Sequence, residues 1–96
     1  MSYFSKKSYN FIKFEKSNRM NKMYDAILLN KKTNKTIKLS FGDSRYENYH
    51  DLTGLNLYPH LTHGDKKRRK SYRARHIGFL KKGYYSPGYL SYNYLW

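Results

Sequence analysis

Three histidines and a nearby aspartate form a candidate set of metal ligands. These are His60, His63 and His76, with Asp65 nearby, and zinc sites without cysteine use three histidines or two histidines and a carboxylate. Seven bases stand in the ten residues after Asp65, and their positive charge would repel a dication. Asp65 also stands where a carboxylate caps a helix. We therefore predict no metal and no cofactor, and we interpret the histidines as packing or hydrogen-bonding groups.

The sequence contains no arrangement typical of catalysis. Its six glycines are scattered, so there is no Gly-rich phosphate loop, and neither a nucleophile elbow nor a close carboxylate pair is present. The lack of cysteine excludes disulfides and thiol, iron–sulfur and cysteine-based zinc chemistry. A histidine-centred nuclease would need a metal carboxylate and a general base in a defined hairpin. We predict that the protein is not an enzyme and has no small-molecule substrate.

A basic segment at residues 65–78 is the strongest local signal. Asp65 can cap the start of a helix, and Gly78 can take the left-handed position that ends one. Bases four residues apart, such as Lys66 and Lys70, each cost about 0.2–0.5 kcal/mol. A helix that accumulates such penalties is expected to meet anions, with a solvated basic face as the alternative. The expected polyanion-binding residues are Lys66, Lys67, Arg68, Arg69, Lys70, Arg73 and Arg75; the thin apolar stripe is Tyr72, His76 and Phe79 or Leu80.

Aromatic residues gather at the end of the sequence. Residues 84–96 hold five tyrosines and the sole tryptophan. Ser86 and Pro87 fit a helix N-cap followed by proline at the first helical position, which would place Leu90 and Tyr94 on one face. We predict a buried anchor, either in the core or against a partner, and stacking on nucleic-acid bases is a third alternative. The anchor residues are Tyr92, Tyr94, Leu95 and Trp96.

The first third of the chain predicts strands. Residues 36–41 alternate most cleanly, with Ile37, Leu39 and Phe41 on one face. Residues 9–14 form an aromatic run that would place Ile12 and Phe14 together, and residues 23–29 are another candidate. Polar residues 30–35 fit a hairpin loop, and residues 42–44 fit a turn. Because an isolated hairpin is marginal in water, its apolar face must be covered.

Residues 43–64 are less regular and are the expected cover of the sheet. Their hydrophobic anchors are Tyr46, Tyr49, Leu52, Leu55, Leu57, Tyr58 and Leu61. We predict turns at residues 53–54 and 58–60 and a short helix at about 44–52. The whole pattern predicts a small α+β fold: a two- or three-stranded antiparallel meander followed by a basic helix and an aromatic C-terminal segment. Its parts are a flexible basic arm (1–8), the meander (9–42), an irregular lid (43–64), the basic helix (65–78) and the aromatic tail (84–96).

Positive charge is abundant and unevenly distributed along the 96 residues, whose formal net charge is +14. Residues 1–42 hold ten bases and two acids, residues 43–65 one base and four acids, and residues 66–96 nine bases and no acid. Internal pairing of Asp43, Glu47 and Asp51 would leave a large excess, which favours polyanionic or acidic partners.

Aromatic side chains supply most of the apolar surface of a single small domain. The chain has 12 Tyr, 5 Phe and 1 Trp, and each ring buries about 150–250 Å². So short a chain has a thin core, so we expect marginal stability and order gained from a partner. The longest apolar run, residues 26–29, is far below the roughly 20 residues of a membrane span, and the first seven residues lack a signal-peptide hydrophobic region.

A spaced set of residues covers about half of the chain and carries a resemblance. It comprises Phe41-Gly42, Tyr46, Tyr49, Asp51, Thr53, Gly54, Tyr58, His60-Leu61-x-His63-x-Asp65, Arg68-Arg69, Tyr72, Arg75-His76 and Ser91-x-x-Tyr94-Leu95-Trp96. In this spacing the chain resembles a family of short basic proteins of nucleocytoplasmic large DNA viruses. The resemblance implies a viral protein, expected in the virion and in the host cytoplasm or viral factory during infection. It brings no activity and no catalytic residues.

Two classes of function fit these observations. The first is a structural or interaction protein of a large virus particle, a minor capsid or core-associated adaptor that binds acidic or polyanionic surfaces. Its expected partners are larger viral structural proteins, nucleic acid or both. The aromatic ending and thin core favour it. The second is a sequence-nonspecific DNA- or RNA-binding protein that uses the basic helix, which the net charge favours.

Overall fold

A three-stranded antiparallel sheet is the centre of the structure, a computed structural model that describes residues 4–78 and 84–96. Its strands β2 (Tyr9–Lys16), β3 (Lys22–Asn30) and β4 (Thr36–Asp43) are neighbours in chain order. The 3-10 helix η1 (Pro59–Leu61), helix α1 (Lys66–His76) and helix α2 (Pro87–Tyr94) follow. The predicted small α+β fold is confirmed. No helix in the described ranges is long and apolar enough to cross a membrane.

A bulge in β2 changes which side chains face the core. The register of β2 on β3 shifts between Phe11 and Lys13, and such an extra residue re-aims the side chains around it. Phe11 and Phe14 consequently lie together, with ring centroids 4.6 Å apart, whereas Ile12 is 47% exposed. The expectation that Ile12 and Phe14 share a face was wrong, because alternation fails across a bulge.

The β3–β4 hairpin ends in the polar loop that the sequence predicts. Asn30 Oδ1 accepts hydrogen bonds from the Lys32 and Thr33 N–H groups at 2.9 and 3.3 Å. Asn34 has a φ of 58°, a left-handed conformation that asparagine adopts more readily than most residues. Side chains of the loop therefore support its own turn.

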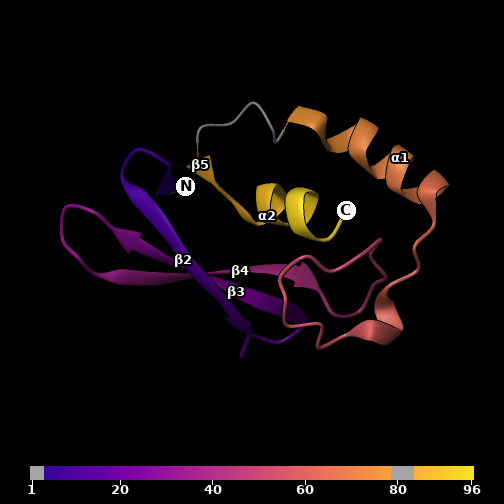
Figure 1. Cartoon of the computed structure of the whole chain (residues 1–96), viewed down its shortest axis with the longest axis horizontal. Helices are drawn as coiled ribbons and strands as arrows, with labels where there is room; N and C mark the ends of the chain where they lie inside the picture. Colours follow the sequence, from indigo (N-terminus) through magenta and orange to yellow (C-terminus); the bar gives the residue numbers. More distant parts are fainter. Residues whose placement is uncertain (1–3, 79–83) are drawn as a thin grey trace.

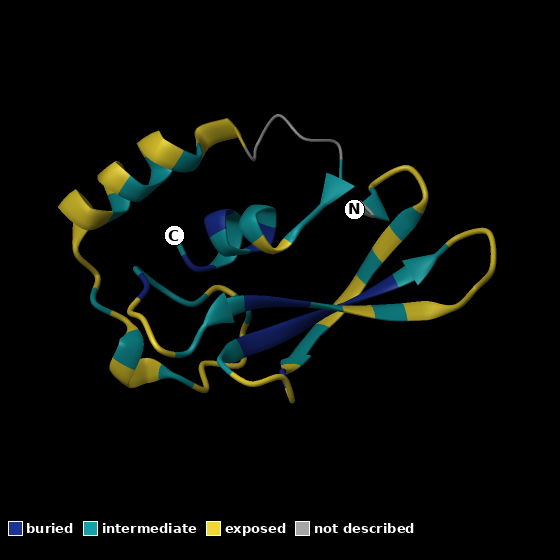
Figure 2. Cartoon of the chain, turned by 180° about the vertical axis from the view of Figure 1, so that it is seen from behind, coloured by how far each residue is buried: buried dark blue, intermediate teal, exposed yellow. Residues whose placement is uncertain are grey.

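Helix α2 covers the apolar face of the sheet. It lies between the sheet and α1 in Figure 1, and in Figure 2 the buried residues concentrate in β3, β4 and α2. The core cluster consists of Met23, Tyr24, Ala26, Leu28, Phe41, Leu90 and Leu95. Because Leu90 and Leu95 come from the C-terminal segment, this segment closes the core that the meander begins.

The start of α2 follows the predicted cap. Ser86 Oγ accepts the Tyr89 N–H at 3.1 Å, and Pro87 is the first helical residue. Just before it, strand β5 (Tyr84–Tyr85) pairs with strand β1 (Phe4–Ser5). Lys6 Nζ donates to the Tyr89 hydroxyl and lies 4.0 Å from that ring's centroid. Phe4, Ser5 and Lys6 of the predicted basic arm therefore contact the tail, whereas Lys7 and Ser8 are exposed; residues 1–3 lie outside the described residues.

The backbone of residues 49–52 is bonded to the end of α2. The Tyr49 and His50 N–H groups donate to the Leu95 carbonyl at 3.0 and 3.1 Å, and the Leu52 N–H donates to the Tyr94 carbonyl at 2.9 Å. These amides are thus used between segments, and residues 43–58 contain no helix. The expected helix at about 44–52 was wrong for this reason: helix C-terminal carbonyls need donors, and this segment supplies them.

Tyr24 ties the same segment to the sheet. Its hydroxyl donates to Asp51 Oδ2 and accepts the Leu57 N–H at 3.0 Å. Burial, together with the hydrogen bond to Asp51, raises the pKa of Tyr24 to about 12. Tyr58 and Leu61 pack against the core from this side. Residues 43–64 therefore cover an edge of the core, whereas α2 provides the main cover.

Candidate polyanion-binding surface

Helix α1 lies on the outside of the molecule, above α2 (Figure 1). Asp65 caps it as expected, since Oδ1 accepts the Lys67 and Arg68 N–H groups at 2.9 and 3.3 Å. At its other end the chain tightens into a 3-10 turn at residues 77–78. Gly78 does not have positive φ, so the expected left-handed ending was wrong. Phe79 and Leu80, expected on the apolar stripe, lie outside the described residues.

The outer face of α1 is basic and open to solvent. Lys66, Lys67, Lys70 and Arg75 are exposed. Within residues 4–78 and 84–96, none of these four cations forms an ion pair. Residues four apart share a helix face, so Lys67 and Arg75 stand two turns apart in one row with Ser71 between them. This row offers cations at both ends and a hydroxyl in the middle.

A hollow runs along this row. It has a volume of about 320 Å³ and is lined by Lys67, Arg68, Ser71, Tyr72, Arg75 and Trp96. Cationic and hydroxyl groups on an aromatic floor can bind phosphate oxygens through charge-assisted hydrogen bonds.

Two of the expected polyanion-binding residues face inward instead. Arg69 Nε donates to the Trp96 carbonyl at 2.7 Å, and Arg73 Nη1 donates to the Tyr92 carbonyl at 3.3 Å. The guanidinium of Arg69 lies 4.7 Å from the Tyr49 ring centroid, and that of Arg73 lies 4.2 Å from the Tyr92 ring centroid. Cations at a helix C-terminus stabilise its exposed carbonyls and its dipole. These two arginines therefore attach α1 to α2.

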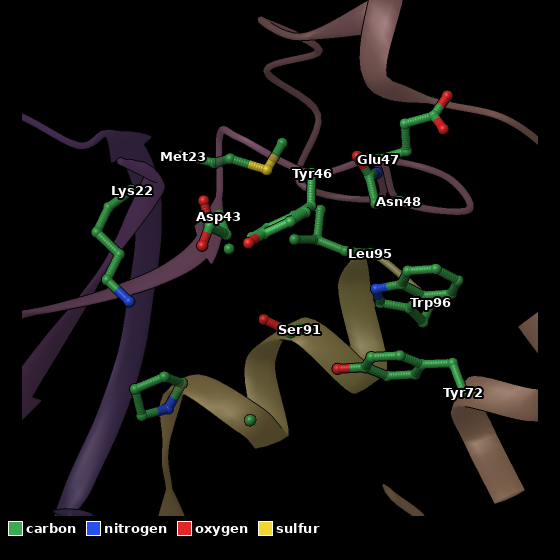
Figure 3. Close-up of a pocket in the computed structure, with 13 residues that line it drawn as sticks. Lys22, Met23, Asp43, Tyr46, Glu47, Asn48, Tyr72, Ser91, Leu95 and Trp96 are labelled. Atoms are coloured by element: carbon green, nitrogen blue, oxygen red, sulfur yellow. The ribbon is translucent and has the colours of Figure 1, made fainter. Parts of the chain in front are cut away.

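Aromatic stacking attaches the same two helices. The rings of Tyr72 and Trp96 lie side by side in Figure 3, with centroids 4.3 Å apart and planes inclined by 7°. His63 lies 5.2 Å from Trp96, centroid to centroid. No residue of α1 is buried, so this stack and the arginine contacts hold the basic helix in place. Partial burial raises the pKa of the Tyr72 hydroxyl.

Two acidic residues near α1 are already paired with arginines, whereas Asp65 caps the helix. Glu47 Oε1 lies 3.2 Å from Arg68 Nη1, so Arg68 is only partly available for a ligand. Asp43 pairs with Arg45 at 2.7 Å, and the hydrogen bond from Arg45 lowers the pKa of Asp43 to about 2. Both acids line the pocket of about 310 Å³ shown in Figure 3. They therefore place little unpaired negative charge beside the basic face.

The aromatic anchor residues are engaged within the chain. Tyr92 and Leu95 are 0% and 2% exposed, and the Tyr94 ring packs edge-on against Phe14 at 4.7 Å. Trp96 is half-buried under Tyr72. The structure thus uses all four residues to close the fold, and Trp96 also lines the hollow beside α1.

The histidines serve local contacts. His63 Nδ1 accepts the Asp65 N–H at 2.8 Å, and the His76 and Tyr72 rings lie 4.4 Å apart. His60 is exposed in η1. Among the described residues, no three histidine, cysteine, aspartate or glutamate side chains are grouped to hold a metal ion.

The inward role of Arg69 and Arg73 is the feature of this surface that the sequence analysis missed. A signal for it exists, because Arg69, Tyr72, Arg73 and His76 follow the i, i+3, i+4, i+7 spacing of a single helix face. Tyr72 and His76 were expected to face inward, so the two arginines on the same stripe had to do so as well. Ser71, in the middle of the outer row, was also not anticipated.

Comparisons of this chain with protein-family models, with curated proteins and with solved structures give no match. The surface must therefore be interpreted from its own geometry.

Proposed function

We propose that the protein is a non-enzymatic binding module that contacts the phosphate backbone of nucleic acid through the outer face of α1, without reading its sequence. The observation that carries this proposal is the set of four exposed cations on α1, Lys66, Lys67, Lys70 and Arg75, which have no acidic partner within the described residues. Phosphate contacts of this kind fix position and supply affinity but carry no sequence information.

The composition of this face favours phosphate over a protein surface. Besides its cations, the outer face carries Ser71 and Ala74, and the exposed Ile77 follows at the end of α1. The rings of Tyr72 and Trp96 are stacked on each other. Protein interfaces are depleted in lysine at their centres and have an apolar core. Lysine and arginine are instead the usual partners of phosphate oxygens.

A salt titration tests this function. Fluorescence anisotropy on a short duplex DNA should give a log–log slope of roughly −4 against salt concentration if four phosphates are contacted. Changing Lys67→Gln and Lys70→Gln together should reduce the slope by about 2. Lys16→Gln with Arg19→Gln is the matched control, since it removes equal charge from two exposed residues outside α1, one at the end of β2 and one in the turn that follows it. A slope near zero for the folded wild-type protein contradicts the proposal.

A second function rests on a different surface. Leu52, Leu55 and Leu57 lie close together in the sequence and are 58%, 37% and 45% exposed. Exposed leucines in one segment favour a protein partner, because a partner that buries them removes apolar surface from contact with water, which is favourable. Together with the resemblance to proteins of large DNA viruses, they support a small virion component that binds larger viral structural proteins. Fractionation of purified particles tests this: the protein should remain with the shell or the DNA-bearing core, and its absence from particles would contradict this function.

A further inference from the structure

A second basic hollow lies at the hairpin end of the sheet, away from α1. It has a volume of about 520 Å³ and is lined by Lys7, Ser8, Tyr9, Asn30, Lys31 and Lys32. Two segments distant in sequence form it, because Tyr9 is paired with Asn30 in the sheet and the Lys31 N–H donates to the Ser8 carbonyl at 3.0 Å. This backbone bond holds Lys7 on the same side of the sheet end as Lys31 and Lys32.

The three lysines of this hollow carry uncompensated charge. Lys7, Lys31 and Lys32 are exposed and form no ion pair within the described residues. Asp25 is five residues from Asn30 along β3, which corresponds to about 17 Å. Glu15, opposite Asp25 in the sheet, is already paired with Lys13 and Lys38. An anion at the hairpin end therefore meets three cations without a competing acid.

Hydrogen-bonding groups line the same hollow. The Tyr9 hydroxyl accepts from Asn30 Nδ2 at 3.4 Å, and a phenol in this role still has its own proton to donate. Asn30 Oδ1 accepts hydrogen bonds from the backbone of the turn. These bonds fix the backbone from which the Lys31 and Lys32 side chains extend. Lysines combined with hydroxyl donors form the usual recognition set for phosphate oxygens.

We propose that this hollow is a second phosphate-binding site and that the chain bridges two separate stretches of nucleic acid, one at α1 and one at the hairpin end. The proposal rests on the proposed function of α1. Figure 1 places the β3–β4 loop and the start of α1 toward opposite ends of the molecule, whose longest extent is 42 Å. A duplex of about 8 base pairs is about 27 Å long. Such a duplex bound at one end leaves the other end open to a second duplex.

A two-duplex capture experiment tests the bridge. One hairpin DNA with a stem of about 8 base pairs is immobilised, and a second, fluorescent copy is added with the protein at low salt. The wild-type protein, shown to be monomeric by sedimentation, should retain the fluorescent duplex. The protein with both Lys31→Gln and Lys32→Gln should capture the fluorescent duplex about tenfold less or weaker still. This variant should still bind the immobilised duplex. Lys16→Gln with Arg19→Gln removes the same charge and should capture like the wild type.

The outcomes separate the bridge from the function of α1. If the wild type binds one duplex but captures no second one, the bridge is overturned and the function of α1 stands. Capture that persists in the Lys31→Gln, Lys32→Gln protein, with its fold intact by circular dichroism, also overturns the hairpin-end site. If the wild type binds no duplex at all, the proposed function fails and the bridge fails with it.

Discussion

Tyr72 and Trp96 stack almost in parallel, with ring centroids 4.3 Å apart and planes inclined by 7°. Tyr72 belongs to the basic helix α1, and Trp96 follows the helix α2 that closes the core. The stack therefore links the binding surface to the fold. Because α1 buries no residue, this stack, together with the contacts of Arg69 and Arg73, decides how firmly the cations are presented.

Replacing Trp96 by alanine should lower the free energy of unfolding by about 2 kcal/mol. Large aromatic truncations in full burial cost about 3–5 kcal/mol, and Trp96 is only half-buried. Urea denaturation followed by circular dichroism measures the loss. In the wild type, the emission of this sole tryptophan should be blue-shifted and should move to the red as the chain unfolds. Tyr46→Ala is the control, since Tyr46 is 64% exposed; an equal loss in both variants would contradict the role of the stack.

Arg69 and Lys70 are adjacent cations that should behave differently. Arg69→Gln removes the hydrogen bond to the Trp96 carbonyl and should destabilise the protein by about 1 kcal/mol, since hydrogen bonds from charged groups contribute about 1.5–3 kcal/mol before discounting for exposure. Lys70→Gln should leave stability unchanged and reduce the salt slope of DNA binding by about 0.9. Chemical denaturation and anisotropy titration on both proteins measure the two effects. A loss of stability in the Lys70→Gln protein alone would reverse the assignment.

The sequence predicts the strands and helices of the fold better than it predicts which distant segments they contact. Alternation identifies β4, and the Ser86–Pro87 pair identifies the start of α2, because both signals act over a few residues. The bulge at Ile12 depends on pairing with β3, so no pattern within β2 reveals it. Residues 49–52 are irregular because their amides bond to the end of α2, a contact with a segment more than 40 residues away.

The candidate site shows the same division. Charge density predicts that α1 carries the cations, because charge is visible in composition. It does not distinguish the exposed Lys70 from the inward Arg69, since that depends on where α2 ends. The proposed site at the hairpin end is harder to predict from the sequence, because its Lys7 and Lys31 are brought together only by the pairing of β2 with β3.

Acidification should weaken the fold below pH 6.5 through His63. Its Nδ1 accepts the Asp65 N–H, so protonation breaks this bond at the start of α1. Burial, and then the charge of Arg68, hold the pKa of His63 below 6.5; burial acts in the same direction on the pKa of His50. A lowered pKa means that the unfolded chain binds the proton more readily. The stability is therefore complete above pH 6.5 and is lost as pH falls through the lower pKa of the folded state.

Urea midpoints measured between pH 7.5 and 5 check this dependence. His63→Gln should reduce this dependence and leave the part due to His50, whereas His60→Gln, at an exposed histidine in η1, should leave it as in the wild type. Asp43 contributes in a separate window, because its pKa is lowered from 3.8 to about 2 and its stabilisation is lost only near those values. A wild-type midpoint that does not change from pH 7.5 to 5 would contradict the role of His63.

Gly42, the glycine of β4, should tolerate replacement less well than Gly54, because two separate effects meet at Gly42. Its φ is +76°, and a Cβ at this position would lie 3.0 Å from Leu95 Cδ1 and 3.1 Å from Met23 Cβ. Gly54 has a similar φ of +85°, but a Cβ there meets nothing within 4 Å. Gly54→Ala should therefore show the backbone strain alone, about 1 kcal/mol, whereas Gly42→Ala adds an overpacking cost of about 1–3 kcal/mol. Equilibrium urea unfolding of both variants measures the difference, which reports how tightly Leu95 seals the core. Equal losses would mean that Leu95 yields to the added methyl group, and the C-terminal segment would then be packed more loosely than its burial indicates.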